Sequence, residues 1–221
     1  MKKYIKIFRK CRLFCDISDE DILRMLVCMG AKVESFDKKY TIFREGSVAK
    51  YIGIMLSGTA QNVRVDYNGN RSIISEIGTS ETFGEAFACA ELKSTPVSVI
   101  AVEPCEVMFI ECAHILHTCH NHCGFHSQMI YNLMRELADK TIRYYKKAEI
   151  TSQRTTRDKL LTYLTVVSKE KNVMSFDIPF DRQELADYLE VDRSGLSAEI
   201  SKLRNEGVLK SNKSHFVLLL N

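Results

Sequence analysis

The stretch that decides the fold is DRQELADYLEVDRSGLSAEISKLRNEG, residues 181–207. Asp181 is followed three residues later by Glu184, which is the pattern of a capping box and predicts the start of a helix. Asp192 predicts a second helix start only a few residues after the first helix ends. Two short helices joined by so tight a turn form a helix-turn-helix, in which the second helix projects from the domain.

The apolar residues of this stretch predict which faces of the two helices are buried. They are Leu185, Tyr188 and Leu189 on the first helix, and Leu196, Ile200 and Leu203 on the second. Ala186 lies where the helices touch, and Glu190 occupies a turn position where glycine is common, so we expect backbone strain at Glu190. Residues 208–220 then predict a two-stranded hairpin around Ser211-Asn212, which completes a winged helix.

The polar face of the second helix predicts contact with DNA. Arginine grips guanine through a bidentate pair, serine addresses bases or phosphates, and lysine reaches phosphates. Side chains at helix starts are further candidates, because free N–H groups and the helix dipole favour anions there. The candidate DNA-binding residues are Thr155, Arg157, Arg182, Gln183, Glu184, Arg193, Ser194, Ser197 and Lys202. The alternative is that this face is an ordinary solvated helix surface.

The N-terminal half of the chain has the pattern of a helix followed by short strands. Ser18 and Gly30 predict the two ends of a helix over residues 18–30. Its expected buried face consists of Ile22, Leu23, Leu26 and Val27. From residue 31 to about 112, short apolar runs alternate with glycine-containing turns, which is typical of a sandwich, roll or barrel. Tyr67-Asn68-Gly69-Asn70 predicts a hairpin with a type I′ turn.

Residues 126–148 predict one long helix that neither glycine nor proline interrupts. One stripe of this helix is apolar, and such a stripe on a helix longer than its own domain needs often pairs with its copy in a dimer. The candidate dimerisation residues are Ile130, Leu133, Met134, Leu137, Thr141 and Tyr144. The alternative is a long helix that packs only on its own domain.

Composition and charge narrow the class of protein. The net charge of +3 is mild, so charge alone does not identify a nucleic-acid binder. We find neither a signal peptide nor an apolar run long enough to cross a bilayer, which predicts a cytoplasmic protein without membrane contact. The eight cysteines are then expected to be thiols. The sequence has no nucleophile–base set, phosphate-cradling glycine loop or paired carboxylates, so we do not expect an enzyme.

Over nearly its full length the chain resembles bacterial transcription regulators of the Crp/Fnr type. Four segments carry the resemblance: RLFCDIS (12–18), IFREGSVAKYIGIMLSGTAQ (42–61), SEIGTSETFGEAFAC (75–89) and RQELADYLEVDRSGLS (182–197). Family members often have a second arginine at the position of Ala198, so one DNA contact is missing here and we expect a different operator preference.

The resemblance implies an α+β fold in three parts. They are an N-terminal antiparallel β-roll like a cyclic-nucleotide-binding domain (1–125), a dimerisation helix (126–148) and a C-terminal winged helix-turn-helix (149–221). It also implies a homodimer that binds a near-palindromic operator in double-stranded DNA under the control of a small effector. RNA polymerase is then an expected further partner.

Residues 83–99, FGEAFACAELKSTPVSV, are similar to the family's phosphate-binding cassette. Gly84 and Glu85 match the pair that contacts ribose and backbone, but Thr95 and Pro96 stand where an Arg-Ser pair grips the cyclic phosphate. Burying a phosphate without a cation is strongly unfavourable, so we expect an effector other than cyclic AMP, or a vestigial pocket, and no resident cofactor. The candidate pocket residues are Gly84, Glu85, Ala86, Phe87, Thr95, Pro96, Val97, Tyr144 and Tyr145. The two tyrosines fit the dimer seam equally well.

The stretch ECAHILHTCHNHCGFH, residues 111–126, supports a second hypothesis. On a helix its side chains would pair on one face, where they would bind a metal or haem or report redox state. The candidates are His114, His117, Cys119, His122, Cys123 and His126. Their spacing is not that of a zinc knuckle, and buried packing thiols are the simpler interpretation. The alternative function is therefore a regulator that senses metal, haem or thiol redox state through residues 112–126.

Overall fold

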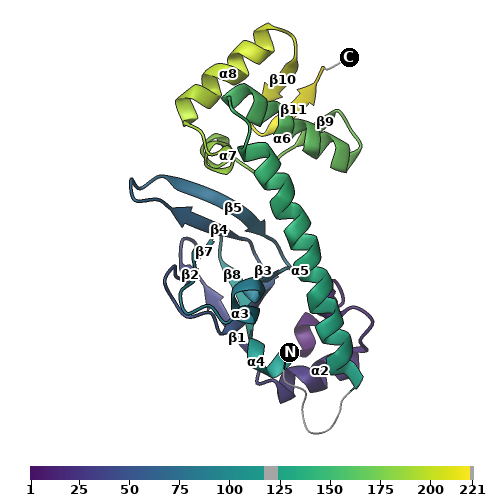
Figure 1. Cartoon of the computed structure of the whole chain (residues 1–221). Helices are drawn as coiled ribbons and strands as arrows, with labels where there is room; N and C mark the ends of the chain where they lie inside the picture. The colour runs from purple at the N-terminus through teal and green to yellow at the C-terminus, as the bar shows by residue number, and fades with distance from the viewer. Residues whose placement is uncertain (117–123, 220–221) are drawn as a thin grey trace. The chain divides into compact units, whose positions relative to one another are not determined.

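A computed structural model shows how these patterns fold, and it describes residues 1–116 and 124–219 (Figure 1). The chain divides into two compact units. The first comprises Met1–Arg64 and Ile74–Ile142, and the second comprises Val65–Ile73 and Arg143–Asn221. Antiparallel sheets and helices make up both units, as the predicted α+β class requires. Among the described helices, none combines the length and apolar character needed to span a bilayer.

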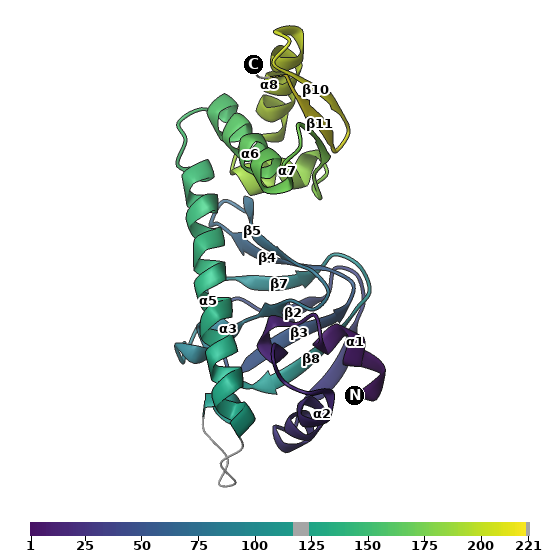
Figure 2. The same ribbon diagram turned by 90° about the vertical axis from the view of Figure 1, so that its right-hand side faces the viewer.

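Two four-stranded antiparallel sheets form the predicted β-roll. One has the strand order β1-β8-β3-β6 and the other β2-β7-β4-β5, and Figure 2 shows β4, β7, β2, β3 and β8 one after another. The strands are Lys32–Phe36 (β1), Thr41–Phe43 (β2), Tyr51–Ser57 (β3), Ala60–Val65 (β4), Arg71–Ile77 (β5), Thr82–Phe83 (β6), Ser98–Ala101 (β7) and Cys105–Glu111 (β8). β8 is central to the first sheet, because its Met108 lies opposite both Val33 and Ile54.

Short helices precede, separate and follow these strands, and the first unit ends at residue 142, within one long helix. The 3-10 helices are Lys2–Tyr4 (η1) and Arg12–Phe14 (η2), and the α-helices are Ile5–Phe8 (α1), Asp19–Cys28 (α2), Glu85–Cys89 (α3), Cys112–Leu116 (α4) and Gly124–Thr151 (α5). Both predicted ends of α2 are confirmed. Ser18 Oγ accepts the backbone N–H of Asp21 at 3.2 Å, and Gly30 has a φ of +63°.

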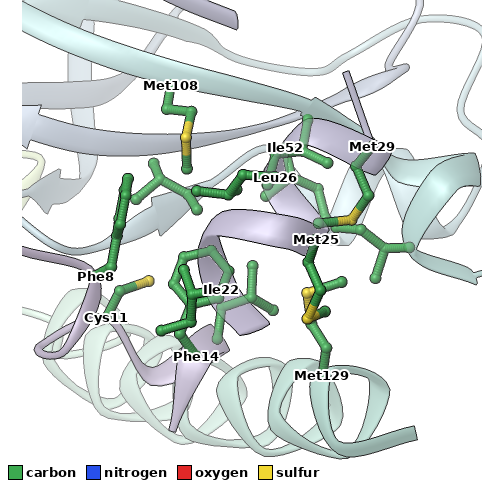
Figure 3. Close-up of a cluster of buried hydrophobic side chains, with 14 of the residues drawn as sticks. Phe8, Cys11, Phe14, Ile22, Met25, Leu26, Met29, Ile52, Met108 and Met129 are labelled. Carbon is green, nitrogen blue, oxygen red and sulfur yellow. The ribbon is translucent and has the colours of Figure 1, made fainter. Parts of the chain in front are cut away.

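The core of the first unit lies between α2, α5 and the sheet (Figure 3). Ile22 and Leu26 of α2, and Met29 directly after its end, pack with Met129 of α5 in this cluster. The expectation that Val27 is buried was wrong, because its side chain is 78% exposed. Five residues of helix turn Val27 about 140° away from Ile22. Met25 and Met29 take the buried positions instead.

A buried asparagine fixes the N-terminal segment to α5. Asn132 Nδ2 donates to the carbonyl oxygens of Leu13, at 3.1 Å, and of Cys15, at 2.7 Å. Gln128 Nε2 in turn donates to Asn132 Oδ1 at 3.1 Å. Satisfied polar groups of this kind specify one arrangement of a core, so the RLFCDIS segment is held in a defined place on α5.

The hairpin between β4 and β5 is present, but its turn is not the predicted type I′. That turn needs a positive φ at both central residues, and only Gly69 has one, at +84°. Asp66 organises the turn instead, since its Oδ1 accepts the backbone N–H groups of Asn68 and Asn70, each at 2.8 Å. The aspartate side chain therefore replaces the backbone geometry expected of Asn68-Gly69.

The second unit contains a winged helix-turn-helix. Its elements are Thr156–Lys171 (α6), Ser175–Asp177 (β9), Arg182–Leu189 (α7), Arg193–Asn205 (α8), Leu209–Asn212 (β10) and His215–Leu218 (β11). The sheet has the order β10-β11-β9. The wing turn lies two residues beyond the predicted Ser211-Asn212, because the buried Leu209 and Leu218 pair across the ladder and centre the turn on Lys213-Ser214.

In the second unit, Lys147 of α5 is buried against Tyr188 of α7. Lys147 is 8% exposed, its Nζ is 3.5 Å from the centre of the Tyr188 ring, and this atom has no hydrogen-bond partner in the described chain. Burial lowers the pKa of Lys147 from 10.5 to about 8, although the charge of Glu190 opposes this shift. The contact with the ring offsets part of the cost of burying the ammonium.

We predict that Lys147→Met stabilises the second unit at neutral pH by about 1–3 kcal/mol, because it removes a buried charge. Between pH 8 and 10.5 the folded state has released the Lys147 proton while the unfolded state keeps it, so the wild-type free energy of unfolding rises with pH in this window. Urea unfolding at several pH values should show this rise in wild type and in the exposed control Lys169→Met, but not in Lys147→Met. The same rise in all three proteins would contradict the prediction.

Candidate DNA-binding and effector sites

The first helix of the helix-turn-helix begins at the predicted capping box. Asp181 Oδ1 accepts the backbone N–H groups of Gln183, at 2.7 Å, and Glu184, at 2.8 Å. Glu184 Oε2 returns the interaction by accepting the N–H of Asp181 at 2.9 Å. Three helix-start donors are satisfied, so the beginning of α7 is fixed by local sequence alone.

The turn between α7 and α8 has the backbone strain expected of it. Glu190 has a φ of +54°, and the N–H of Val191 donates to the carbonyl of Ala186 at 3.1 Å. Lys159 Nζ donates to the carbonyl of Glu190 at 3.2 Å. Ala186 is completely buried, as expected of a residue that lies where the two helices touch. The close approach of the helices and the left-handed residue together set how α8 projects.

The two faces of α8 are as predicted. Leu196, Ile200 and Leu203 are at most 3% exposed and belong to the core of the second unit. The opposite face is exposed and consists of Arg193, Ser194, Ala198, Ser201, Lys202 and Asn205, with Ser197 half-buried beside it. A face of small polar and basic side chains permits close approach to a DNA groove.

Several predicted DNA contacts have side chains that already hold the fold together. Arg157 Nη2 donates to Glu206 at 2.6 Å and its Nη1 to Glu199 at 3.2 Å, and the bond to Glu206 raises the pKa of Arg157. Thr155 Oγ1 donates to Asp158 at 2.7 Å. These two residues therefore cap α6 and tie it to α8, and their predicted phosphate contacts compete with internal bonds.

The same competition applies to three predicted contacts around α7 and α8. Gln183 Nε2 donates to Asp187 at 2.8 Å, Ser194 Oγ donates to the N-cap Asp192, and Glu184 completes the capping box. The bond from Ser194 lowers the pKa of Asp192. These polar side chains were predicted to face DNA because the sequence shows their type and not their partners.

Arg182 lies against the wing. Its Nη2 donates to the carbonyl of Lys213 at 3.5 Å, and its guanidinium carbon is 5.8 Å from the centre of the Phe216 ring. Burial lowers the pKa of Arg182. Of the predicted set, Arg193, Ser197 and Lys202 thus keep side chains for which no hydrogen bond or ion pair is found among the described residues.

The effector cassette begins at Gly84, and any larger residue at this position would have to displace neighbouring atoms. Gly84 has a φ of +79°, and a Cβ there would lie 2.6 Å from Cε2 of Phe43 and 3.0 Å from the carbonyl oxygen of Tyr51. Gly84 is the N-cap of α3. Gly84 thus lies close against Phe43 and Tyr51, and the neighbouring Glu85 lies in the interior, where it is 3% exposed.

Lys140 of α5 forms an ion pair with Glu85. Lys140 Nζ donates to Glu85 Oε1 at 2.6 Å, to the Thr82 carbonyl at 2.5 Å and to Thr82 Oγ1 at 3.0 Å. Glu136 Oε1 is 3.7 Å from the same ammonium. An ammonium has three donors, so these acceptors use all of them. Two carboxylates share one cation, and the formal charge of the group is negative.

The other end of the cassette is also internally bonded. Thr95 is 5% exposed, and its Oγ1 donates to the carbonyl of Arg44 at 3.0 Å and lies 3.4 Å from Ser47 Oγ. Val97 is buried, Phe87 is half-buried, and Ala86 and Pro96 are exposed. Tyr144 and Tyr145 are exposed on the part of α5 that belongs to the second unit.

Solved structures share this arrangement of elements. The match with the c-di-GMP-responsive global regulator CLP of Xanthomonas campestris covers 90% of this chain and 98% of the CLP chain. The two chains are 19% identical, and the TM-score is 0.73. The match with FixK2 of Bradyrhizobium japonicum covers 86% of this chain and 93% of the FixK2 chain, with 19% identity and a TM-score of 0.65. The match with TTHB099, a CRP-family transcriptional regulator of Thermus thermophilus, covers 85% of this chain and 92% of that chain, with 20% identity and a TM-score of 0.60. No curated protein sequence matches the chain significantly.

Two family models match the two functional regions. The cyclic nucleotide-binding domain matches residues 33–122, and the Crp-like helix-turn-helix domain matches residues 158–221. The chain belongs to the Crp/Fnr family of transcription regulators. It therefore joins an effector-binding domain to a DNA-binding domain, and neither matched model describes a catalytic domain.

The Cys/His stretch of this Crp/Fnr-family chain is described only at its ends. His117, Cys119, His122 and Cys123 lie outside the described residues. His114 Nδ1 is 2.9 Å from the carbonyl oxygen of Met29, and the buried His126 has its Nε2 3.3 Å from the carbonyl oxygen of His114. Within residues 1–116 and 124–219, no group of three His, Cys, Asp or Glu side chains is placed to hold a metal.

Sequence reasoning missed Lys140 as a residue of the effector domain. Its only local signal is Glu136 one turn earlier on α5, a spacing that is typical of an ordinary surface ion pair. Glu85 lies 55 residues away, and no short-range pattern connects the two. The regulator's cassette is thus completed by a residue of its long helix.

We predict that Lys140→Met lowers the free energy of unfolding of the first unit by about 3 kcal/mol, because Glu85 and Glu136 then stay buried without their cation. Urea unfolding followed by circular dichroism measures the change. Lys140→Met with Glu85→Gln should recover part of the loss. Lys93→Met, which replaces another lysine of the same cassette, serves as the control and should change little. Equal stability of the Lys140 and Lys93 variants would contradict the prediction.

Proposed function

We propose that this regulator acts as a homodimer that places one α8 in each half-site of a near-palindromic operator, under the control of a small effector other than cyclic AMP. Two exposed surfaces support the proposal. One is the polar face of α8, and the other is a row of apolar side chains on α5. Operator binding places the protein with the chromosome in the cytoplasm, and transcription control makes RNA polymerase its further partner.

The DNA contacts centre on Arg193, Ser197 and Lys202. Arg193 lies in the first turn of α8, the part of a recognition helix that approaches base edges, and no described residue holds its guanidinium. Ser197 and Lys202 continue the same face toward the helix end. Ala198 stands between them where relatives often have a second arginine, so base readout rests mainly on Arg193.

The dimer seam follows the exposed row of α5. Tyr131, Met134, Ile142 and Tyr145 recur at helical spacing and are 51%, 57%, 55% and 72% exposed. An exposed apolar row of this length needs a cover, and a second copy of α5 supplies one.

This row shifts the seam relative to the sequence-based set. Met134, Thr141 and Tyr144 of that set are exposed and stay in the proposed seam. Leu133 is 2% exposed within the core of its own unit, and Leu137 packs on that core. Ile130 is half-buried. Half of the predicted set thus packs inward fully or in part, while the neighbouring row that begins at Tyr131 faces out.

The character of the effector follows from the bonds of the cassette. Lys140 uses all its donors internally and Thr95 donates to Arg44, so neither is available to a phosphate. Glu85 Oε2 is buried without a hydrogen-bond partner in the described chain. A ligand that donates hydrogen bonds suits this oxygen, while an anion would approach a group with negative formal charge.

We predict that Arg193→Ala weakens specific operator binding by about 10- to 100-fold, the usual value of one bidentate base contact. The operator is first selected from a random-sequence duplex library with the wild-type protein. Fluorescence anisotropy at fixed salt then gives the affinity of each variant. Lys169→Ala is the matched control, since its exposed side chain lies about 18 Å along α6 from Arg157.

Two results would contradict this proposal. One is equal operator affinity of Arg193→Ala and Lys169→Ala. The other is an increase in wild-type operator affinity on addition of cyclic AMP at concentrations that saturate cyclic-AMP sensors.

We predict that Met134→Glu raises the dimer dissociation constant by at least about 10-fold, because it buries a carboxylate in the apolar seam. Sedimentation-velocity measurements across a concentration series report the change. Val27→Glu is the control, since Val27 is an apolar side chain of α2 that is 78% exposed and outside α5. A monomeric wild-type protein, or equal dimerisation of both variants, would overturn the assigned seam.

A further inference from the structure

Two cysteine sulfur atoms are in contact beside the effector cassette. The Sγ atoms of Cys89 and Cys112 are 3.5 Å apart. Cys89 is the last residue of α3, and Cys112 is the first residue of α4, 23 residues later. Cys89 is half-buried and Cys112 is 3% exposed. A disulfide bond is about 2.05 Å long, so the sulfur atoms need to approach by only about 1.5 Å.

We propose that Cys89 and Cys112 are a peroxide-oxidised thiol pair, which forms a reversible disulfide that joins α3 to α4. Cys89 is the residue that meets the oxidant, because it is the more exposed of the two. Cys112 lies behind it and resolves the oxidised intermediate.

The two cysteines differ in how the contact between their sulfur atoms affects them. The contact lowers the pKa of Cys89 and raises that of Cys112. Glu85 opposes thiolate formation at both residues, and Glu91 does so at Cys112. The thiolate is the nucleophile in such chemistry, so the asymmetry favours first attack by Cys89.

The reaction balances with one peroxide for each disulfide. The Cys89 thiolate attacks one oxygen of hydrogen peroxide, the O–O bond breaks, and the released hydroxide takes a proton to become water. Cys89 is then a sulfenic acid. Cys112 attacks the Cys89 sulfur, an S–S bond forms, and the S–O bond breaks to release a second water. Two thiols are oxidised by two electrons and one peroxide is reduced to two waters.

The remaining described cysteines lack this arrangement. Cys11 is 1% exposed, and burial raises its pKa to about 12. Cys105 is 3% exposed, and burial raises its pKa as well. Cys15 and Cys28 are exposed. Among the cysteines of residues 1–116 and 124–219, the sulfur-to-sulfur contact is found at Cys89 and Cys112 alone.

A disulfide at this place would hold the second end of a five-residue helix. Glu85, the first residue of α3, is already bound to Lys140 of α5. A covalent bond at Cys89, the last residue, would fix the other end to α4. Oxidation is therefore expected to restrict any movement of the cassette that effector binding requires.

The experiment uses the full-length chain, reduced under anaerobic conditions and then treated with a stoichiometric amount of hydrogen peroxide. Free thiols are alkylated, the protein is digested without reduction, and tandem mass spectrometry locates the cross-linked residues. We expect a Cys89–Cys112 peptide that dithiothreitol abolishes. Cys112→Ser should instead leave a Cys89 sulfenic acid that dimedone traps, and Cys89→Ser should leave Cys112 as a thiol.

Controls separate this pair from the other thiols. Cys15→Ser with Cys28→Ser removes the exposed cysteines, and Cys119→Ser with Cys123→Ser removes those outside the described residues. Both double variants should keep the cross-link at the wild-type rate. Oxidation that appears at these four positions while Cys89 and Cys112 remain thiols would overturn the proposal. The readout is thiol chemistry in the absence of DNA, so its result is independent of the proposed function.

Discussion

The ammonium of Lys140, whose side chain is 14% exposed, joins the long helix α5 to the effector cassette. Its three N–H groups meet Glu85 and two oxygen atoms of Thr82, and Glu136 lies one turn earlier on α5. Removing two carboxylates from water is costly unless a cation accompanies them. The cassette and α5 consequently depend on each other for their place in the first unit, and a ligand that also binds Glu85 Oε1 has to compete with Lys140.

This competition gives a physical route from the cassette to the proposed dimer seam. A ligand shifts a conformational equilibrium only by the difference in its affinity for the two states. A hydrogen-bond donor that binds Glu85 Oε2 and also replaces Lys140 at Oε1 would release Lys140 and change the contact of α5 with α3. Met134 and Ile142 lie on the same helix as Lys140, so their side chains would move with it. The coupling needs no element besides the helix.

Local patterns predicted the helix-turn-helix well, because its determinants lie within a few residues of one another. The capping box of Asp181 and Glu184, the strained turn at Glu190 and the buried stripe that begins at Leu196 are all short-range features. The structure adds long-range partners that no local pattern encodes. Arg157 is a predicted phosphate contact in the sequence, yet its guanidinium is bound by carboxylates up to 49 residues away.

The same limit explains the shift of the seam on α5. An apolar period shows that a helix has a buried stripe, but it does not show what covers that stripe. Asn132 bonds to the N-terminal segment, whose RLFC motif lies more than a hundred residues earlier, and Leu133 belongs to the same buried cluster as Leu13 and Phe14. Once that segment occupies the apolar stripe, the next row of the helix, beginning at Tyr131, is the exposed surface on which we propose the dimer seam.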